Sequence, residues 1–367
     1  MEEPQHAFCI KIDLQPICEV TNSCDGASFF TQYPEALGTL EFAARAYESF
    51  ADNLLAIPAT PSWTATFVNP DSGSSGFGLS NLTVAEDTVR VYVGGHQLHD
   101  NQLALAGPGG PSGFFARGQG DVVSANATDY AMWGGSIAFT TSPPIGSWYF
   151  GLAEPAPGQI DFLSVATHEL AHIFGFKRGG VPSFFNNISG DQFYGPEAVN
   201  LYGGPVLLFS DNGIWEEHWA DDTTSPPYTE ELETALDRAV VLGSRTLLTP
   251  LDYAALKDIG WQVPDQLLDL HGNTDGDAKI DGADFVHWQR GFGSTSVGAL
   301  QGDSSGDTLV DDLDLWLWEG QFGATRNEVE PAEEIAVPEP AEWTAIFWIC
   351  LFYDRRSSRC QVIGNGF

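Results

Sequence analysis

The segment His168-Glu169-Leu170-Ala171-His172 constrains this chain more than any other feature. Residues i and i+4 of a helix lie one above the other, so two imidazoles at this spacing can bind one metal ion. Glu169 is turned by about 100° from His168 and can lie beside the open side of the metal without binding it. The segment therefore predicts a helix with His168 and His172 as zinc ligands and Glu169 as a general base for water.

The residues around this segment favour a helix. Asp161 is a candidate N-cap, and Gly175 lets the chain turn away after the helix. Apolar residues fall on the face opposite the two histidines, namely Leu163, Ala166, Leu170, Ile173 and Phe174. We therefore expect one face to belong to the core and the other to carry the chemistry. The alternative is a buried helix with two incidental histidines.

Composition excludes some classes of partner. The chain has 367 residues with 15 basic and 50 acidic side chains, a formal net charge of -35. This surface repels nucleic acid and anionic membranes, and the length allows two or more domains. The five cysteines are an odd number and form no recognisable framework, so unpaired thiols are favoured over a bridge among Cys9, Cys18 and Cys24.

Elsewhere the pattern predicts an α+β domain. Helical spacing of apolar residues covers 34–56 and 251–259, and strands are expected at 63–68, 88–93, 136–141 and 148–151. Residues 94–120 are rich in Gly and Pro and are expected to be mostly loop. Ile137–Thr140 is a candidate edge strand for an extended peptide, or else an interior strand. Composition changes after Pro264, which indicates a domain boundary near 264–270.

A catalytic zinc ion needs a third protein ligand and one open position. Arg178, three residues beyond Gly175, cannot bind a metal. His218, within a Trp-Glu-Glu-His-Trp segment, is the leading candidate. The alternatives are Glu216, Glu217, Asp221 and Asp222, and also His96 and His99, which precede the helix in a polar loop.

Residues 28–264 resemble bacterial secreted metallopeptidases of the metzincin and leishmanolysin type. The resemblance is carried by 133–139, the motif helix, 193–196, His218-Trp219 and 256–261. It implies a metzincin-like peptidase domain (a mixed sheet with an active-site helix) and His218 as the third zinc ligand. It also implies an endopeptidase in which a zinc-activated water cleaves peptide substrates with Glu169 as base.

One position departs from the family pattern. Metzincins have a methionine in a turn beneath the zinc, whereas this chain has only Met1 and Met132. By order along the chain the turn should fall near Leu236-Asp237-Arg238, where Leu236 could pack similarly. The alternative function is therefore a catalytically degenerate peptidase domain that serves as an extracellular binding or scaffold protein. A sugar-binding surface protein with incidental histidines is a third hypothesis.

Two later segments, 273–284 and 303–314, share one pattern of acidic and polar residues. Oxygen side chains occupy positions 1, 3, 5, 9 and 12, the EF-hand spacing for calcium. The predicted ligands are Asn273, Asp275, Asp277, Asp281 and Asp284, then Asp303, Ser305, Asp307, Asp311 and Asp314. With Asp at position 12 and no Gly at position 6, residues 270–324 resemble a dockerin. That resemblance implies a small all-α calcium-binding domain with a cohesin-like partner. The alternative is a pair of solvated acidic turns.

The C-terminal end of the chain suggests export, whereas the N-terminal end does not. Residues 1–27 form an N-terminal extension without the basic and apolar regions of a signal peptide. Residues 325–342 are an acidic, Pro-containing linker. The tail 343–367 begins with an apolar run and continues with arginines, and together with Val337-Pro338-Glu339-Pro340 it resembles a PEP-CTERM sorting signal. This implies a secreted or cell-surface protein with transient membrane contact, although the apolar run is shorter than the roughly 20 residues that span a bilayer.

Overall fold

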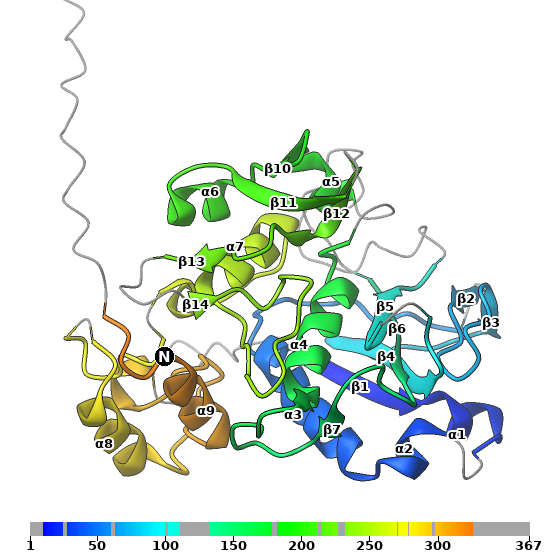
Figure 1. Cartoon of the computed structure of the whole chain (residues 1–367), viewed down its shortest axis with the longest axis horizontal. Coiled ribbons are helices and arrows are strands. Elements are labelled where there is room, and N and C mark those ends of the chain that lie inside the picture. Colours follow the sequence, from blue (N-terminus) through cyan, green and yellow to red (C-terminus); the bar gives the residue numbers. More distant parts are fainter. Residues whose placement is uncertain are drawn as a thin grey trace, which may run out of the picture. The chain divides into compact units, whose positions relative to one another are not determined.

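A four-stranded mixed sheet forms the framework of the computed structural model (Figure 1). The parallel strands β1 (Lys11–Pro16), β4 (Thr88–His96) and β6 (Gly134–Thr140) are followed in the sheet by β5 (Ala104–Pro108), which runs antiparallel to β6. The chain is therefore α+β with a mixed sheet, as predicted. The structure describes residues 10–24, 28–59, 63–99, 102–110, 132–177, 182–211, 214–226, 232–269, 271–277, 279–295 and 298–325.

The structure confirms the interior alternative for Ile137–Thr140, and it corrects the expectation that 94–120 is mostly loop. Every residue of β6 is buried and the strand pairs on both sides, so Ile137–Thr140 is interior. The edge next to it is β5, which lies in the segment predicted to be loop, and β4 likewise extends to His96. Gly and Pro lower strand propensity, but the short edge strand β5 tolerates Gly107 and the final Pro108.

Helices cover this sheet and connect it to smaller strand pairs. The predicted helix 34–56 ends earlier, because α3 spans Glu35–Glu48 and the chain then continues without regular structure. The other elements before residue 180 are α1 (Ile17–Thr21), α2 (Phe29–Gln32), β2 (Thr64–Phe67), β3 (Phe77–Ser80), β7 (Ser147–Tyr149), β8 (Gln159–Asp161) and α4 (Phe162–Ile173).

A second layer follows α4 (Figure 1). It contains a four-stranded sheet of order β12-β11-β10-β9 and the helix α7, which spans Pro250–Ile259 and matches the predicted 251–259. The elements are α5 (Pro182–Asn186), β9 (Ile188–Ser189), β10 (Gln192–Phe193), α6 (Pro196–Tyr202), β11 (Val206–Asp211), β12 (Ile214–Trp219), β13 (Thr224–Ser225), β14 (Leu232–Glu233) and the 3-10 turn η2 (Asp265–Leu268).

Helix α4 lies between the two layers and is buried on all sides. Every residue of α4 except His168 is buried, whereas the sequence predicted a single apolar face. The Tyr47 hydroxyl of α3 donates to the Thr167 carbonyl at 2.6 Å, and the Trp261 indole of the second layer donates to the Phe174 carbonyl at 2.6 Å. The motif helix is therefore held from both sides.

A disulfide joins Cys18 and Cys24 near the start of the described chain. The favoured expectation of unpaired thiols is therefore wrong for these two residues. Their separation of six residues closes a short loop, which composition alone does not reveal. Cys9 lies outside the described residues.

The acidic repeat folds into two similar loop–helix units that make reciprocal contacts. Helix α8 (Gly282–Gly291) follows the first loop, and α9 (Asp312–Gln321) follows the 3-10 turn η3 (Ala299–Gln301) and the second loop. The Trp288 indole of α8 donates to the Asp311 carbonyl at 2.7 Å, and the Trp318 indole of α9 donates to the Asp281 carbonyl at 3.0 Å. Each helix therefore holds the loop of the other unit through a hydrogen bond from its tryptophan.

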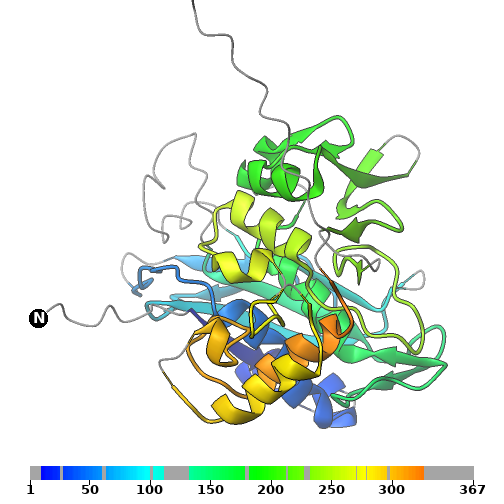
Figure 2. The same cartoon turned by 90° about the vertical axis from the view of Figure 1, so that its left-hand side faces the viewer.

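This repeat packs on α3 rather than standing apart. The rings of Phe42 and Trp316 meet edge to face at 5.4 Å, and Arg45 forms an ion pair with Asp311. Leu313 and Leu317 of α9 are buried in the same hydrophobic core as the central sheet. The described residues on both sides of 264–270 thus share one core. Figure 2 shows α8 and α9 side by side.

The predicted linker beyond Thr325 and the predicted sorting tail 343–367 lie outside the described residues. Among the helices of the described part, none combines the length and the apolar character needed to cross a bilayer.

Replacement of Trp316 by Ala should test this shared core. Trp316 is buried against α3, whereas Trp318 on the same helix is only partly buried. We expect Trp316→Ala to lower the free energy of unfolding by about 3–5 kcal/mol. The matched variant Trp318→Ala should cost about 1–2 kcal/mol. Urea denaturation of the full chain measures both; equal losses would contradict the docking of α9 on α3.

Candidate metal centre

The start of α4 is fixed by a buried ion pair. Asp161 is the N-cap, as predicted, and its carboxylate accepts the Ser164 N–H at 3.1 Å. The Arg245 guanidinium approaches the same carboxylate through two nitrogens, at 2.7 and 2.9 Å, and both side chains are buried. A two-point Arg–carboxylate contact fixes direction as well as distance. The histidines of α4 therefore project from a rigid helix.

The end of α4 is fixed as well. Gly175 has a φ of 102°, which is strained for any residue with a side chain. The turn brings the Phe176 N–H to the Ala171 carbonyl at 3.0 Å and directs the Phe176 carbonyl back toward the helix. That carbonyl lies 2.6 Å from Nδ1 of His172. The predicted turn at Gly175 therefore also orients a metal ligand.

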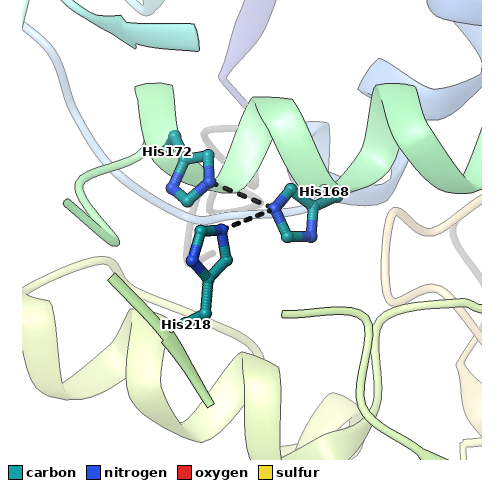
Figure 3. A group of neighbouring side chains, drawn as sticks. All are labelled: His168, His172 and His218. Carbon is teal, nitrogen blue, oxygen red and sulfur yellow. Dashed lines mark hydrogen bonds between the residues drawn. The ribbon is translucent and has the colours of Figure 1, made fainter. Parts of the chain in front are cut away.

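Three imidazoles converge at this site (Figure 3). His168 and His172 project from α4, and His218 comes from β12 on the opposite side. Nε2 of His168 lies 3.1 Å from Nε2 of His172 and 3.2 Å from Nε2 of His218. The ligand atoms of all three lie within 4.8 Å of one another. The three predicted ligands are thus brought together.

The hydrogen bonds of two rings identify their free nitrogens. Nδ1 of His168 lies 2.7 Å from the Ala235 carbonyl, and Nδ1 of His172 lies near the Phe176 carbonyl. A carbonyl can only accept, so Nδ1 carries the proton and Nε2 of each neutral ring presents a lone pair. Two lone pairs facing each other at this distance repel unless a cation lies between them. Tetrahedral Zn–N bonds would separate two nitrogens by about 3.3–3.4 Å, close to the observed distances.

The surroundings keep the imidazoles neutral. Burial lowers the pKa of His168 and lowers that of His172 much further, with His168, His218 and Lys177 adding repulsion at His172. Burial, followed by the charges of His168, Lys177 and Arg238, lowers the pKa of His218 to about 2. Neutral imidazole is the form that binds metal, so protons do not compete for this site near neutral pH.

Glu169 occupies the position expected of a base. Its side chain is buried, and this burial raises its pKa to about 8, while the Lys177 ammonium and the Ala106 N–H of β5 act in the opposite direction. A carboxyl group with a raised pKa is a better proton acceptor once it is ionised. The helix therefore carries a pair of histidines that could hold a metal ion and, between them, a carboxyl group with a raised pKa.

The other candidates for the third ligand lie elsewhere. His96 bonds to the Pro70 carbonyl through Nδ1 at 2.9 Å, and Glu217 pairs with Lys177 at 3.0 Å. Asp221 faces Arg238 at the surface, and the Asp222 N–H donates to Asp237. Within the described residues only the three histidines form a compact ligand group. The side chain of Glu216 and residue Arg178 lie outside what the structure describes.

Asp252 is a supporting residue that the sequence analysis missed. Its buried carboxylate accepts the Ala235 N–H at 3.0 Å and the Trp219 indole N–H at 3.0 Å. Ala235 orients His168, and Trp219 directly follows His218. The same carboxylate caps α7 through Thr249 in a capping box. The Thr-Pro-Leu-Asp spacing at 249–252 signals that cap, but nothing in it indicates contact with the site.

A turn at 235–236 overlaps the segment where the order along the chain predicted one. Ala235 and Leu236 are buried, the Ala235 carbonyl lies beside His168, and the Trp219 N–H donates to the Leu236 carbonyl at 3.0 Å. Leu236 supplies the apolar side chain at this position. Met132, the one methionine within the described residues, packs elsewhere in the core.

The ten residues predicted to bind calcium lie in two loops of unequal exposure. In the first loop, Asp275 and Asp277 lie toward solvent, and Asn273 Oδ1 accepts the Gly276 N–H at 2.9 Å. In the second loop, Asp303, Ser305 and Asp314 are buried. At position 9, Asp281 and Asp311 cap the following helices, and at position 12, Asp284 and Asp314 complete the capping boxes.

Burial raises the pKa of carboxyl groups in the second loop. Burial, with repulsion from Asp303 and Asp307, raises the pKa of Asp314 to about 7. Burial and Asp307 raise the pKa of Asp303 to about 6. These carboxylates do not form a group as compact as the three histidines.

No protein-family model, curated protein or solved structure was found to match this chain. Its function must therefore be argued from the site itself.

Replacement of Asp252 by Asn should weaken metal binding without removing a ligand. In Asn, an NH2 group replaces one carboxylate oxygen, so two donors take the place of an acceptor. The N–H groups of Ala235 and Thr249, which donate to the carboxylate, would then face a donor. We expect affinity for zinc to fall about 10- to 100-fold, as for other outer-layer partners of metal ligands. Competition with a chelating dye measures this, with His218→Ala as the reference for loss of a ligand. Asp258→Asn is the control, since Asp258 is a buried carboxylate that caps α6. Equal losses in both would show that Asp252 has no specific role.

Proposed function

We propose that this chain is a zinc-dependent endopeptidase. The observation that carries the proposal is the convergence of three neutral imidazoles on one point, with Glu169 one residue from His168 on the same helix. Three protein ligands and one open position are typical of a catalytic zinc site, whereas structural sites use four. An all-imidazole set favours zinc over calcium or magnesium, which prefer oxygen.

The roles of the residues follow from their positions. His168, His172 and His218 would hold the ion, which lowers the pKa of a water and polarises the scissile carbonyl. Glu169 accepts the proton of that water and delivers it to the leaving amine. Its position against the Ala106 N–H of β5 supports this assignment, because it places the carboxylate beside the sheet edge.

The edge strand β5 is the candidate surface for the substrate backbone. It replaces Ile137–Thr140 as the candidate, because that segment is an interior strand. One side of β5 pairs with β6, and its other side pairs with no strand among the described residues. An extended peptide can add to such an edge through backbone hydrogen bonds. Ala106 of β5 is close to Glu169, so a peptide on this edge would pass the base.

Replacement of Glu169 by Gln tests the catalytic part. The variant should bind zinc in the same ratio as the parent and lose about 100- to 10,000-fold in kcat, because the amide cannot accept the proton. Casein or a quenched fluorescent peptide gives the rate, and metal analysis gives the zinc content. Glu197→Gln, on exposed α6, is the control and should retain activity. Full activity in Glu169→Gln would remove this residue from the mechanism.

The second candidate is a degenerate peptidase domain that binds without cleaving. Leu236 in place of the usual methionine favours it, because this buried residue directly follows Ala235, whose carbonyl lies beside His168. Bound zinc without chelator-sensitive proteolysis would support this alternative.

For the C-terminal repeat we propose calcium binding by the ten loop residues. The raised pKa values of Asp303 and Asp314, caused first by burial, support it, because a divalent cation would stabilise these buried carboxylates as anions. The duplicated spacing and the capping boxes give both loops the same local design. A cohesin-like partner, export to the cell surface and membrane contact of the tail remain proposals from resemblance.

Removal of calcium from the full chain should lower its stability. At calcium concentrations of about 100 Kd, each site should contribute about 2.7 kcal/mol. Thermal unfolding followed by tryptophan fluorescence, with calcium or with chelator, measures the difference. The double variant Asp284→Asn and Asp314→Asn should lose the response, whereas Asp312→Asn, which alters an exposed non-ligand, should keep it. Identical melting with calcium and with chelator would refute the assignment.

A further inference from the structure

Lys177 places a positive charge at the edge strand beside the metal centre. It follows the Gly175 turn, and its Nζ donates to the Ala106 carbonyl at 3.0 Å. The same ammonium pairs with Glu217 Oε1 of β12 at 3.0 Å. The charge of Lys177 also acts on Glu169 and on all three histidines. Lys177 therefore lies near Glu169 and the three histidines. Its ammonium also contacts β5, the strand proposed to hold the substrate.

A cavity of about 280 Å³ lies next to Lys177. Strand residues alternate between the two faces of a sheet. Ala106 and Ile137 face the core that contains α4, so Leu105 and Gly107 of β5 face the other side with Ser136 and Ala138 of β6. These four residues and Val68 line the cavity together with Lys177. The cavity is thus on the face away from α4, and Lys177 reaches around the sheet edge to it.

The small residues of β5 leave room for this arrangement. A Cβ atom built on Gly107 would lie 3.6 Å from Cε of Lys177, so the aliphatic part of the lysine packs over the glycine. The other side chains at this end of β5 are small, because the residues are Ala106, Gly107 and Pro108. Side chains of a peptide added to β5 would alternate in the same way, and every second one would point toward the cavity.

The cavity carries a positive charge, whereas the chain as a whole is strongly acidic. Among the described residues that line it, Lys177 alone is charged, in a chain with a formal net charge of -35. Its present partner, Glu217, comes from another strand and shows that a carboxylate fits against the ammonium. Both side chains are about one-fifth exposed, at 22% for Lys177 and 21% for Glu217, so an incoming group can reach the pair.

We propose that Lys177 and the cavity beside it form a subsite for an acidic side chain, Asp or Glu, of a peptide lying along β5. This rests on the proposed peptidase function, and it adds the substrate class. The substrate carboxylate pairs with the ammonium beside or in place of Glu217. Lys177 is a specificity-determining residue, and Glu169 keeps the role of base.

The size of the effect follows from the contact. A hydrogen bond to a charged group gives about 10- to 100-fold in affinity, and competition from Glu217 favours the lower end. We therefore expect about a 10-fold preference for Glu over Gln at one position of the peptide. Partial exposure makes the preference weaker at high salt.

The test uses the full chain carrying Glu169→Gln and loaded with zinc, so that binding is measured without cleavage. A fluorescent peptide series moves one Glu through a neutral background, with Gln at the same position as reference. Fluorescence anisotropy should show tighter binding for Glu at one position. Lys177→Met should abolish that preference, so that the Glu and Gln peptides bind with the same affinity. Glu217→Gln should increase the preference.

The control is Lys257→Gln, which removes a partly exposed lysine of α7 that pairs with Asp265. It should keep the preference. Equal binding of the Glu and Gln peptides at every position, or an unchanged preference in Lys177→Met, would overturn the subsite, as would absence of all peptide binding. The parent chain is assayed in parallel for zinc content and for hydrolysis of the neutral peptide. Cleavage without preference refutes the subsite alone, whereas absence of zinc refutes the peptidase.

Discussion

The carboxylate of Asp252 is the contact on which the metal centre depends. It lies in the buried layer between α7 and the turn at 234–236, where a charged group is costly unless it is hydrogen-bonded. Four donors satisfy it, from Thr249, Ala235 and Trp219. Two of them belong to segments that carry or orient ligands. One side chain therefore fixes the position of β12 relative to α4, and with it the third imidazole relative to the other two.

The same rigidity extends to the acidic repeat through α3. One side of α3 holds α4 through Tyr47, while Phe42 and Arg45 on its other side contact Trp316 and Asp311. A helix that packs between two regions transmits a change of position in one to the other only if both contacts are rigid. The contact between the partly buried ring of Phe42 and the buried ring of Trp316 supplies one such contact. A cation in the second loop would therefore strengthen the packing around α3, since Asp311 belongs to that loop.

The sequence predicted what depends on local spacing. The cap at Asp161, the turn at Gly175 and the two histidines of α4 follow from helix periodicity, which a single segment specifies. His218 could be ranked by its position among aromatic residues, but its convergence depends on Asp252. The edge strand β5 was missed because Gly107 and Pro108 resemble a loop when the neighbouring β6 is not considered. Burial of both faces of α4 was missed because Thr167 and Ser164 are polar, yet each is enclosed by other layers.

Ala106 shows how these non-local contacts create chemistry. Its N–H acts on Glu169 and its carbonyl accepts from Lys177, so an acid–base group and a cation meet at one residue of the sheet edge. In an antiparallel edge strand the N–H and C=O of one residue point the same way, and here they point away from β6. A peptide that pairs with this edge must exchange hydrogen bonds with both side chains. Binding of the backbone, delivery of the proton and recognition of a side chain are then coupled at one point of the structure.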